Sequence, residues 1–152
     1  MRKRLQALSL VLVTAAAGSG IAVASAHPVR AQASSTVLHT TAKLTFAHSF
    51  DLGQHGRSAG DITTFGGRLT GPDLNGHYQA SCVNVTRIAQ ECTESLSVPD
   101  GSIAAQAAYG SGSTALTPIV GGSGRYLGAR GDMSEQEIDG GREVRLVLHL
   151  AQ

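Results

Sequence analysis

Residues 76–109 read GHYQASCVNVTRIAQECTESLSVPDGSIAAQAAY, three runs of alternating side chains separated by short turns. Side chains alternate between the two faces of a strand, so this pattern predicts strands over His77–Thr86, Cys92–Val98 and Ser102–Tyr109. Pro99-Asp100-Gly101 predicts a tight hairpin, because Asp-Gly readily takes the positive φ angles that such a turn needs. The stretch therefore predicts three consecutive antiparallel strands.

Similar runs continue on both sides, each bounded by Gly, Asp, Asn or Pro. They predict five further strands: Thr36–Phe50, Asp61–Leu69, Ala115–Val120, Arg125–Ile138 and Arg142–Leu150. The chain has 19 glycines, 4% aromatic residues and no Trp, which favours a turn-rich β protein over a helical bundle. We therefore predict an all-β fold, an eight-stranded antiparallel barrel, because closure removes the exposed edge strands.

The strand faces can be sorted by their period of two. One face of four predicted strands carries large apolar side chains that we expect to line an interior cavity: Tyr78, Leu96, Ile103 and Leu146. Val83, Val85 and Val147 fall on the opposite faces, so part of the outer wall is expected to be covered by another subunit. The sequence therefore favours a homo-oligomer.

Cys82 and Cys92 are the only cysteines. They differ by an even number, so a hairpin centred near Arg87 would place them opposite each other on one face. In an oxidising compartment such a pair usually forms a disulfide. The alternative is a catalytic thiolate, but no neighbouring His or Lys in the sequence would lower its pKa. Two cysteines alone do not make a zinc site, and we expect no metal.

The N-terminus has the features of a secretory signal peptide. Arg2-Lys3-Arg4 precedes a run without charge, and Ala24-Ser25-Ala26 matches a cleavage site. We predict a signal peptide over 1–26, with cleavage after 33 as the alternative, a flexible segment over 27–36 and the barrel over 37–152. A retained membrane anchor is less favoured, because residues after Val13 turn to Ala, Gly and Ser. The mature protein is expected to be secreted or extracytoplasmic.

The charge balance argues against a nucleic-acid partner. The whole chain has 12 Lys and Arg against 11 Asp and Glu, and removal of Arg2-Lys3-Arg4 leaves an excess of acid. Binding to nucleic acid requires a basic surface that neutralises phosphates.

Residues 118–131, PIVGGSGRYLGARG, resemble the glycine-rich signature of dirigent proteins and allene oxide cyclases. Residues 59–61, 76–82 and 100–106 are similar to other strands of that superfamily, in the same order. The secreted, two-cysteine version resembles its bacterial branch. The glycines themselves predict a sharp turn at 121–124 and a bulge near 128–131. A phosphate loop is excluded, because no Lys follows at the required spacing.

The resemblance implies a barrel with an apolar cavity, assembled as a trimer and without a cofactor. It also implies a function: binding a small hydrophobic intermediate and directing its cyclisation or coupling. Cys82 falls where the plant cyclases keep a cavity cysteine. Those cyclases carry a carboxylate on the first strand, whereas residues 44–48 here read LTFAH, so activity on a fatty-acid epoxide is not favoured.

Seven polar residues are candidates for the site. His48, a general base at neutral pH, and Asp61 are the catalytic candidates. The ligand-binding candidates are Tyr78, Asn84, Gln106, Tyr109 and Arg130. Each has a structural alternative, such as capping a turn or pairing at the surface. The alternative function is a non-catalytic barrel that binds an apolar ligand or serves as a structural module, so the sequence leaves catalysis open.

Overall fold

The computed structural model describes residues 35–110 and 116–151 as a closed barrel of eight antiparallel strands, which confirms the predicted fold class. The signal peptide predicted over 1–26, its alternative end at 33 and most of the 27–36 segment lie outside the described residues. The elements are β1 Ser35–Phe50, β2 Ile62–Thr70, β3 Gly76–Asn84, β4 Gln90–Val98, β5 Gly101–Tyr109, β6 Leu116–Gly124, β7 Arg130–Ile138, the short helix η1 Asp139–Gly141 and β8 Glu143–Ala151.

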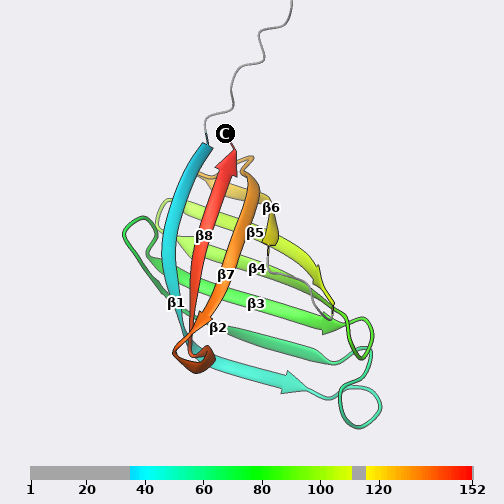
Figure 1. The fold of residues 1–152 in the computed structure, drawn as a ribbon. Coiled ribbons are helices and arrows are strands. Elements are labelled where there is room, and N and C mark those ends of the chain that lie inside the picture. Colours follow the sequence, from blue (N-terminus) through cyan, green and yellow to red (C-terminus); the bar gives the residue numbers. More distant parts are fainter. Residues whose placement is uncertain (1–34, 111–115, 152) are drawn as a thin grey trace, which may run out of the picture. The chain divides into compact units, whose positions relative to one another are not determined.

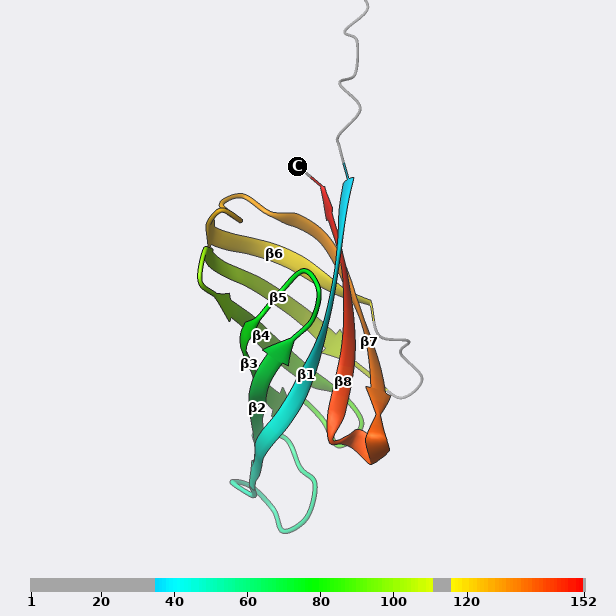
Figure 2. The ribbon, with the colours of Figure 1, turned by 90° about the vertical axis from the view of Figure 1, so that its left-hand side faces the viewer.

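Each strand pairs with its neighbours in the sequence, and β1 pairs with β8 to close the barrel. Figure 1 shows β1, β8 and β7 running side by side, with β3, β4 and β5 crossing at an angle behind them. The turned view separates these two walls, with β3 to β6 opposite β1 and β8 (Figure 2).

Strands β3, β4 and β5 pair with one another in the antiparallel order that their alternation predicts. Pro99 and Asp100 form the two-residue connection between β4 and β5, and Gly101 has a φ of 146°. On the other side Cys82 and Cys92 are direct partners in register. The third strand ends earlier than predicted, at Asn84, because the amides of Val85 and Thr86 both donate to the carbonyl of Ala89 and close a loop.

A bulge in β1 decides which of its side chains face inward. The register with β2 shifts between Leu44 and Phe46. One inserted residue exchanges the two faces of a strand. Beyond the bulge Ala47 therefore faces the interior, whereas Phe46 and His48 are exposed and stack on each other, their ring centroids 5.9 Å apart.

The glycine-rich segment is placed differently from its prediction. Residues 121–124 continue strand β6 instead of forming a turn, and the turn follows at 125–129. A side chain at Gly122 would lie 2.5 Å from the carbonyl oxygen of Tyr126, which folds back across the strand. Gly124 ends the strand with a φ of 58°. These glycines allow the chain to return so that Tyr126 is buried in the core.

The apolar core fills one half of the barrel. Tyr78, Leu96, Ile103 and Leu146, which we expected to line a cavity, are each 0% exposed. The core cluster closes that end with Leu74 and Tyr126. The predicted inward faces are therefore confirmed for these side chains, but they pack against one another, and any cavity lies elsewhere in the barrel.

Candidate functional site

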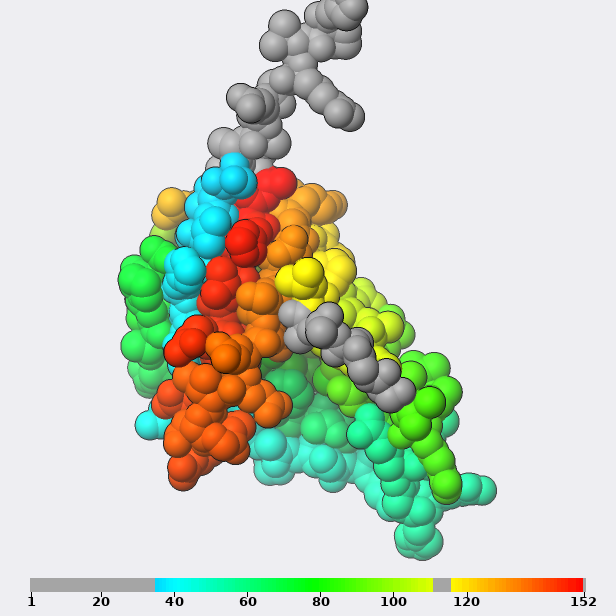
Figure 3. Space-filling model, viewed as in Figure 1, coloured from blue at the N-terminus to red at the C-terminus, as the bar shows by residue number. Residues whose placement is uncertain are grey.

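The other half of the barrel is open, toward the end that carries the 51–61 and 85–89 loops and η1. It holds a cavity of about 350 Å³. Its lining residues are Leu44, Ala47, Phe65, Cys82, Gln90, Cys92, Glu94, Tyr109, Glu135, Glu137, Gly141 and Val144. In Figure 3 the surface steps inward between the end of β7 with η1, in orange, and the green strands. A volume of this size accommodates a small organic molecule.

A cluster of oxygen atoms forms the polar wall of the cavity. Glu94 on β4 is 2% exposed, and it accepts hydrogen bonds from the Tyr78 hydroxyl at 2.9 Å and from the Tyr109 hydroxyl at 3.0 Å. The Tyr109 hydroxyl also lies 3.1 Å from Glu135 Oε1, and Thr117 Oγ1 donates to that same oxygen at 2.6 Å. Strands β3 to β7 thus bring two carboxyl groups and three hydroxyl groups together.

The hydroxyl protons alone do not satisfy this cluster. Tyr109 has close contacts to Glu94, Glu135 and Thr117, and Thr117 has one further contact to Glu135. Two hydroxyl protons serve these four oxygen–oxygen contacts. A proton on one of the carboxyl groups supplies a third donor, so the geometry favours a pair of carboxyls that hold one proton between them.

Electrostatics agree with this reading of the hydrogen bonds. Burial, and then the negative charge of Glu135, raise the pKa of Glu94 to about 7 against the opposing hydrogen bonds from the two tyrosines. Burial also raises the pKa of Tyr78 and of Tyr109 well above the ordinary value, so both remain donors. Near neutral pH Glu94 therefore exchanges a proton readily, which is the property of a general acid or base.

Two of the predicted ligand-binding residues belong to this cluster. Tyr109 lines the cavity. Tyr78 is fully buried behind Glu94 and donates a hydrogen bond to it, so its role is to position the carboxyl group.

Three other candidates lie on the outer surface. His48 is exposed beside Phe46, because the β1 bulge turns it away from the interior. Gln106 is exposed and donates to Glu91 at 2.8 Å. Arg130 donates to the backbone carbonyls of Val120 and Ala129, both at 2.7 Å. None of the three lines the barrel cavity.

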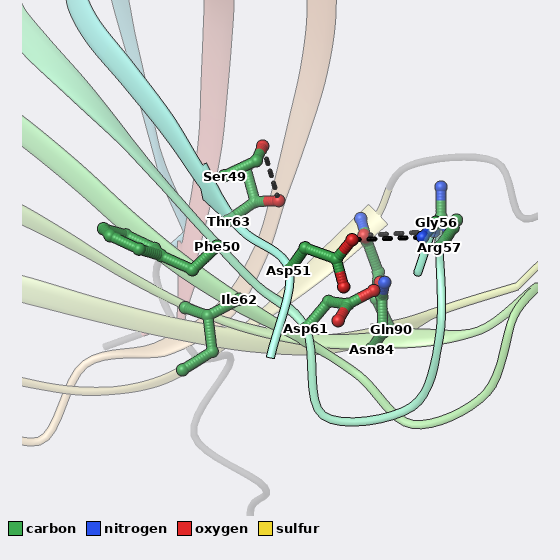
Figure 4. Close-up of a pocket in the computed structure, with 10 residues that line it drawn as sticks. All are labelled: Ser49, Phe50, Asp51, Gly56, Arg57, Asp61, Ile62, Thr63, Asn84 and Gln90. Atoms are coloured by element: carbon green, nitrogen blue, oxygen red, sulfur yellow. Dashed lines mark hydrogen bonds between the residues drawn. The ribbon is translucent and has the colours of Figure 1, made fainter. Parts of the chain in front are cut away.

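Asp61 and Asn84 line a second cleft at the same end of the barrel, about 330 Å³ in volume (Figure 4). Asp61 accepts hydrogen bonds from the amides of Ser58 at 2.6 Å and Leu52 at 3.1 Å, and the Ser58 amide is the main cause of its lowered pKa. Its carboxylate is thus occupied in holding the 51–61 loop. The two clefts share Gln90 as a lining residue.

Sequence reasoning missed Glu94, Thr117 and Glu135. Glu94 had a usable signal, since alternation places it on the inward face between Cys92 and Leu96. A carboxylate in such an apolar row is expensive to bury without partners, which marks it for attention. Thr117 and Glu135 lie on strands whose registers the sequence did not define.

Cys82 and Cys92 form a disulfide that lines the cavity. Replacing both by alanine is expected to lower the free energy of unfolding by about 2–3 kcal/mol, because the bond constrains a short loop in the unfolded chain. Urea unfolding of the double variant and the parent tests this. Equal stability of the two proteins would contradict it, and the parent measured with a phosphine reductant provides the control.

Within residues 35–110 and 116–151, no three His, Cys, Asp or Glu side chains are grouped so as to hold a metal ion. No helix there has the length and apolar character needed to cross a membrane.

The fold of the barrel is similar to that of several solved structures. No protein-family model and no curated protein matches the chain. Pyocyanin demethylase superposes with a TM-score of 0.66 at 19% identity, covering 76% of this chain and 100% of that one. A nonspecific haem-binding cyclase that catalyses (4 + 2) cycloaddition during neoabyssomicin biosynthesis gives 0.64 at 20%, covering 80% and 68%. AbnU, an exo-specific intermolecular Diels–Alderase, gives 0.60 at 16%, covering 78% and 99%. At these identities the similarity shows the fold.

Proposed function

We propose that the protein binds a small hydrophobic molecule in the barrel cavity and directs its cyclisation or coupling, with Glu94 as the acid–base group. One observation carries this proposal: a carboxyl group that is 2% exposed, surrounded by hydroxyl donors and a second carboxyl, lines a cavity whose facing wall is apolar. Such an arrangement costs stability, and it is typical of catalytic sites.

The cavity offers two contributions to a ring closure. Its apolar wall, formed by Leu44, Phe65 and Val144, restricts a flexible substrate to a few folded conformations. The protonated Glu94 donates a hydrogen bond to an acceptor atom conjugated with the reacting double bond, which draws electron density from that bond. A cycloaddition of this kind is an isomerisation, so all atoms of the substrate remain in the product.

Two structural neighbours and a resemblance in the sequence support this class of function. Two of the superposed barrels are named as catalysts of cycloaddition. The sequence resemblance to allene oxide cyclases and dirigent proteins, which we propose as a distant relationship, supports the same class. The N-terminal pattern supports action outside the cytoplasm after export.

A linear triene ketone, with a diene and an enone joined by three carbons, provides the test substrate. We expect the protein to accelerate its cyclisation and to favour one diastereomer, as measured by chiral gas chromatography. Ala47→Phe fills the cavity and is expected to remove the acceleration, because Ala47 lines it. Ala108→Phe, exposed on the outer face opposite Glu91, is the matched control.

The non-catalytic alternative gives a different result in the same experiment. A ketone that binds to the parent and not to Ala47→Phe, but cyclises at the background rate, would establish a binding barrel instead of a catalyst. Absence of binding would overturn both functions.

We also propose that the protein forms a homo-oligomer, the trimer that the sequence resemblance implies. Phe46 and Phe50 on β1 and Val83 on β3, the two strands that flank β2, are 38%, 50% and 41% exposed, an unusual number of large apolar side chains for an outer wall. Light scattering at micromolar concentration is expected to give a multiple of the chain mass, and Val83→Lys is expected to reduce it. A monomeric parent would contradict the proposal.

A further inference from the structure

Among the residues that the structure describes, acidic side chains line the barrel cavity and no basic side chain does. Glu94, Glu135 and Glu137 line it, and no Lys, Arg or His is among its lining residues. The titratable groups that face Glu94 are Tyr78 on β3, Tyr109 on β5 and Glu135 on β7. The side chains that β1, β2 and β8 contribute are apolar.

The arginines at this end of the barrel do not neutralise the negative charge inside the cavity. Arg57 and Arg87 lie on the 51–61 and 85–89 loops, both are exposed, and they line an adjoining cleft outside the cavity. Water and salt screen their charges, whereas the charge of a carboxylate inside the barrel is screened much less.

The acidic side chains that line the cavity discriminate among ligands by charge. A carboxylate on the ligand would meet like charge in a poorly solvated space and would lose its own hydration. A base would instead receive the proton that the carboxyl pair holds and then form an ion pair with the carboxylate left behind. Hydrogen bonds with a charged partner are among the stronger interactions in proteins.

We propose that the ligand of this cavity carries a weakly basic nitrogen, conjugated with its apolar body, and no carboxylate. In the bound state the O–H bond of the carboxyl pair breaks and an N–H bond forms, which leaves a cation facing a carboxylate. The inference rests on the proposed function of the cavity and names its substrate class. It excludes fatty-acid-like substrates for this chain.

Quinoline, naphthalene and 2-naphthoate test the inference, because they share one bicyclic shape and differ in charge and basicity. Calorimetry at pH 7 with the full barrel is expected to show quinoline binding about tenfold more tightly than naphthalene and 2-naphthoate binding more weakly than either. The ultraviolet spectrum of bound quinoline is expected to be that of quinolinium, although free quinoline is neutral at this pH.

Variants distinguish binding that depends on the acidic side chains of the cavity from binding that depends on apolar packing alone. Glu94→Gln and Glu137→Gln are each expected to reduce the ratio of quinoline affinity to naphthalene affinity, because both side chains line the cavity. Glu91→Gln, exposed on the outer face of the same strand as Glu94, should leave this ratio unchanged. Equal affinities for quinoline and naphthalene, a neutral spectrum for bound quinoline, or tighter binding of 2-naphthoate would overturn the inference while the cavity remained a binding site. Failure of all three compounds to bind would overturn the proposed function as well.

Discussion

The free energy of unfolding is expected to decrease by about 3 kcal/mol between pH 4.5 and pH 8, in contrast to the usual loss of stability toward acid. The cause is Glu94, whose pKa is raised from an ordinary value of 4.5 to about 7 in the folded protein. Between these values the folded chain binds more protons than the unfolded chain. The contribution of Glu94 to stability is therefore largest below pH 4.5. It falls as the pH rises through 7 and is constant at higher pH.

The isosteric variant Glu94→Gln isolates this contribution. It keeps an acceptor for the Tyr78 hydroxyl and does not ionise, so its stability should not follow the parent's decrease through this range. At pH 8 the variant is expected to be more stable than the parent. Glu91→Gln, an exposed residue on the same strand, should retain the parent's pH dependence. Urea unfolding at a series of pH values measures all three proteins.

Two outcomes would show that folding does not raise the pKa of Glu94. One is a parent whose stability does not change between pH 4.5 and pH 8. The other is a Glu94→Gln variant that keeps the parent's slope. Asp61 does not confuse the result, because its pKa is lowered from 3.8 and its contribution to stability is lost only below this range.

The fold was accessible from the sequence because alternation and turn chemistry agree along most of the chain. The hairpin at Pro99 and Asp100 and the opposition of Cys82 to Cys92 both follow from counting residues. The β1 bulge did not follow, because residues 44–46 carry no Gly or Pro to mark it. That single inserted residue is the reason that His48 faces outward.

The position of the cavity required knowledge of packing. Alternation identifies inward side chains, but whether they meet depends on their volumes and on what the loops cover. Tyr78 and Leu96 fill their half of the barrel, whereas the half around Ala47 and Glu94 is left open. The plant cyclases' carboxylate is missing from the first strand, yet a carboxyl group from β4 reaches the interior. Neither predicted catalytic residue, His48 or Asp61, lines this cavity, so its carboxyl group was not predicted from the sequence.

Cyclisation of the triene ketone is expected to be about 100-fold slower with Glu94→Gln than with the parent at pH 6, because an amide is a weaker hydrogen-bond donor to the developing charge than a carboxylic acid. The parent's rate should fall above pH 7 as Glu94 loses its proton, and the variant's rate should not depend on pH in this range. Stopped-flow or quenched assays at saturating ketone separate this effect from a change in binding. Glu91→Gln is again the matched control.

Tyr78→Phe distinguishes a chemical role of Glu94 from a structural one. The Tyr78 hydrogen bond lowers the pKa of Glu94, so its removal should move the descending limb of the rate profile to higher pH. Loss of a structural contact alone would lower the rate at every pH and leave the position of the limb unchanged. A Glu94→Gln variant that cyclises the ketone as fast as the parent would mean that the cavity acts by confinement alone, because the apolar wall is then sufficient for the rate.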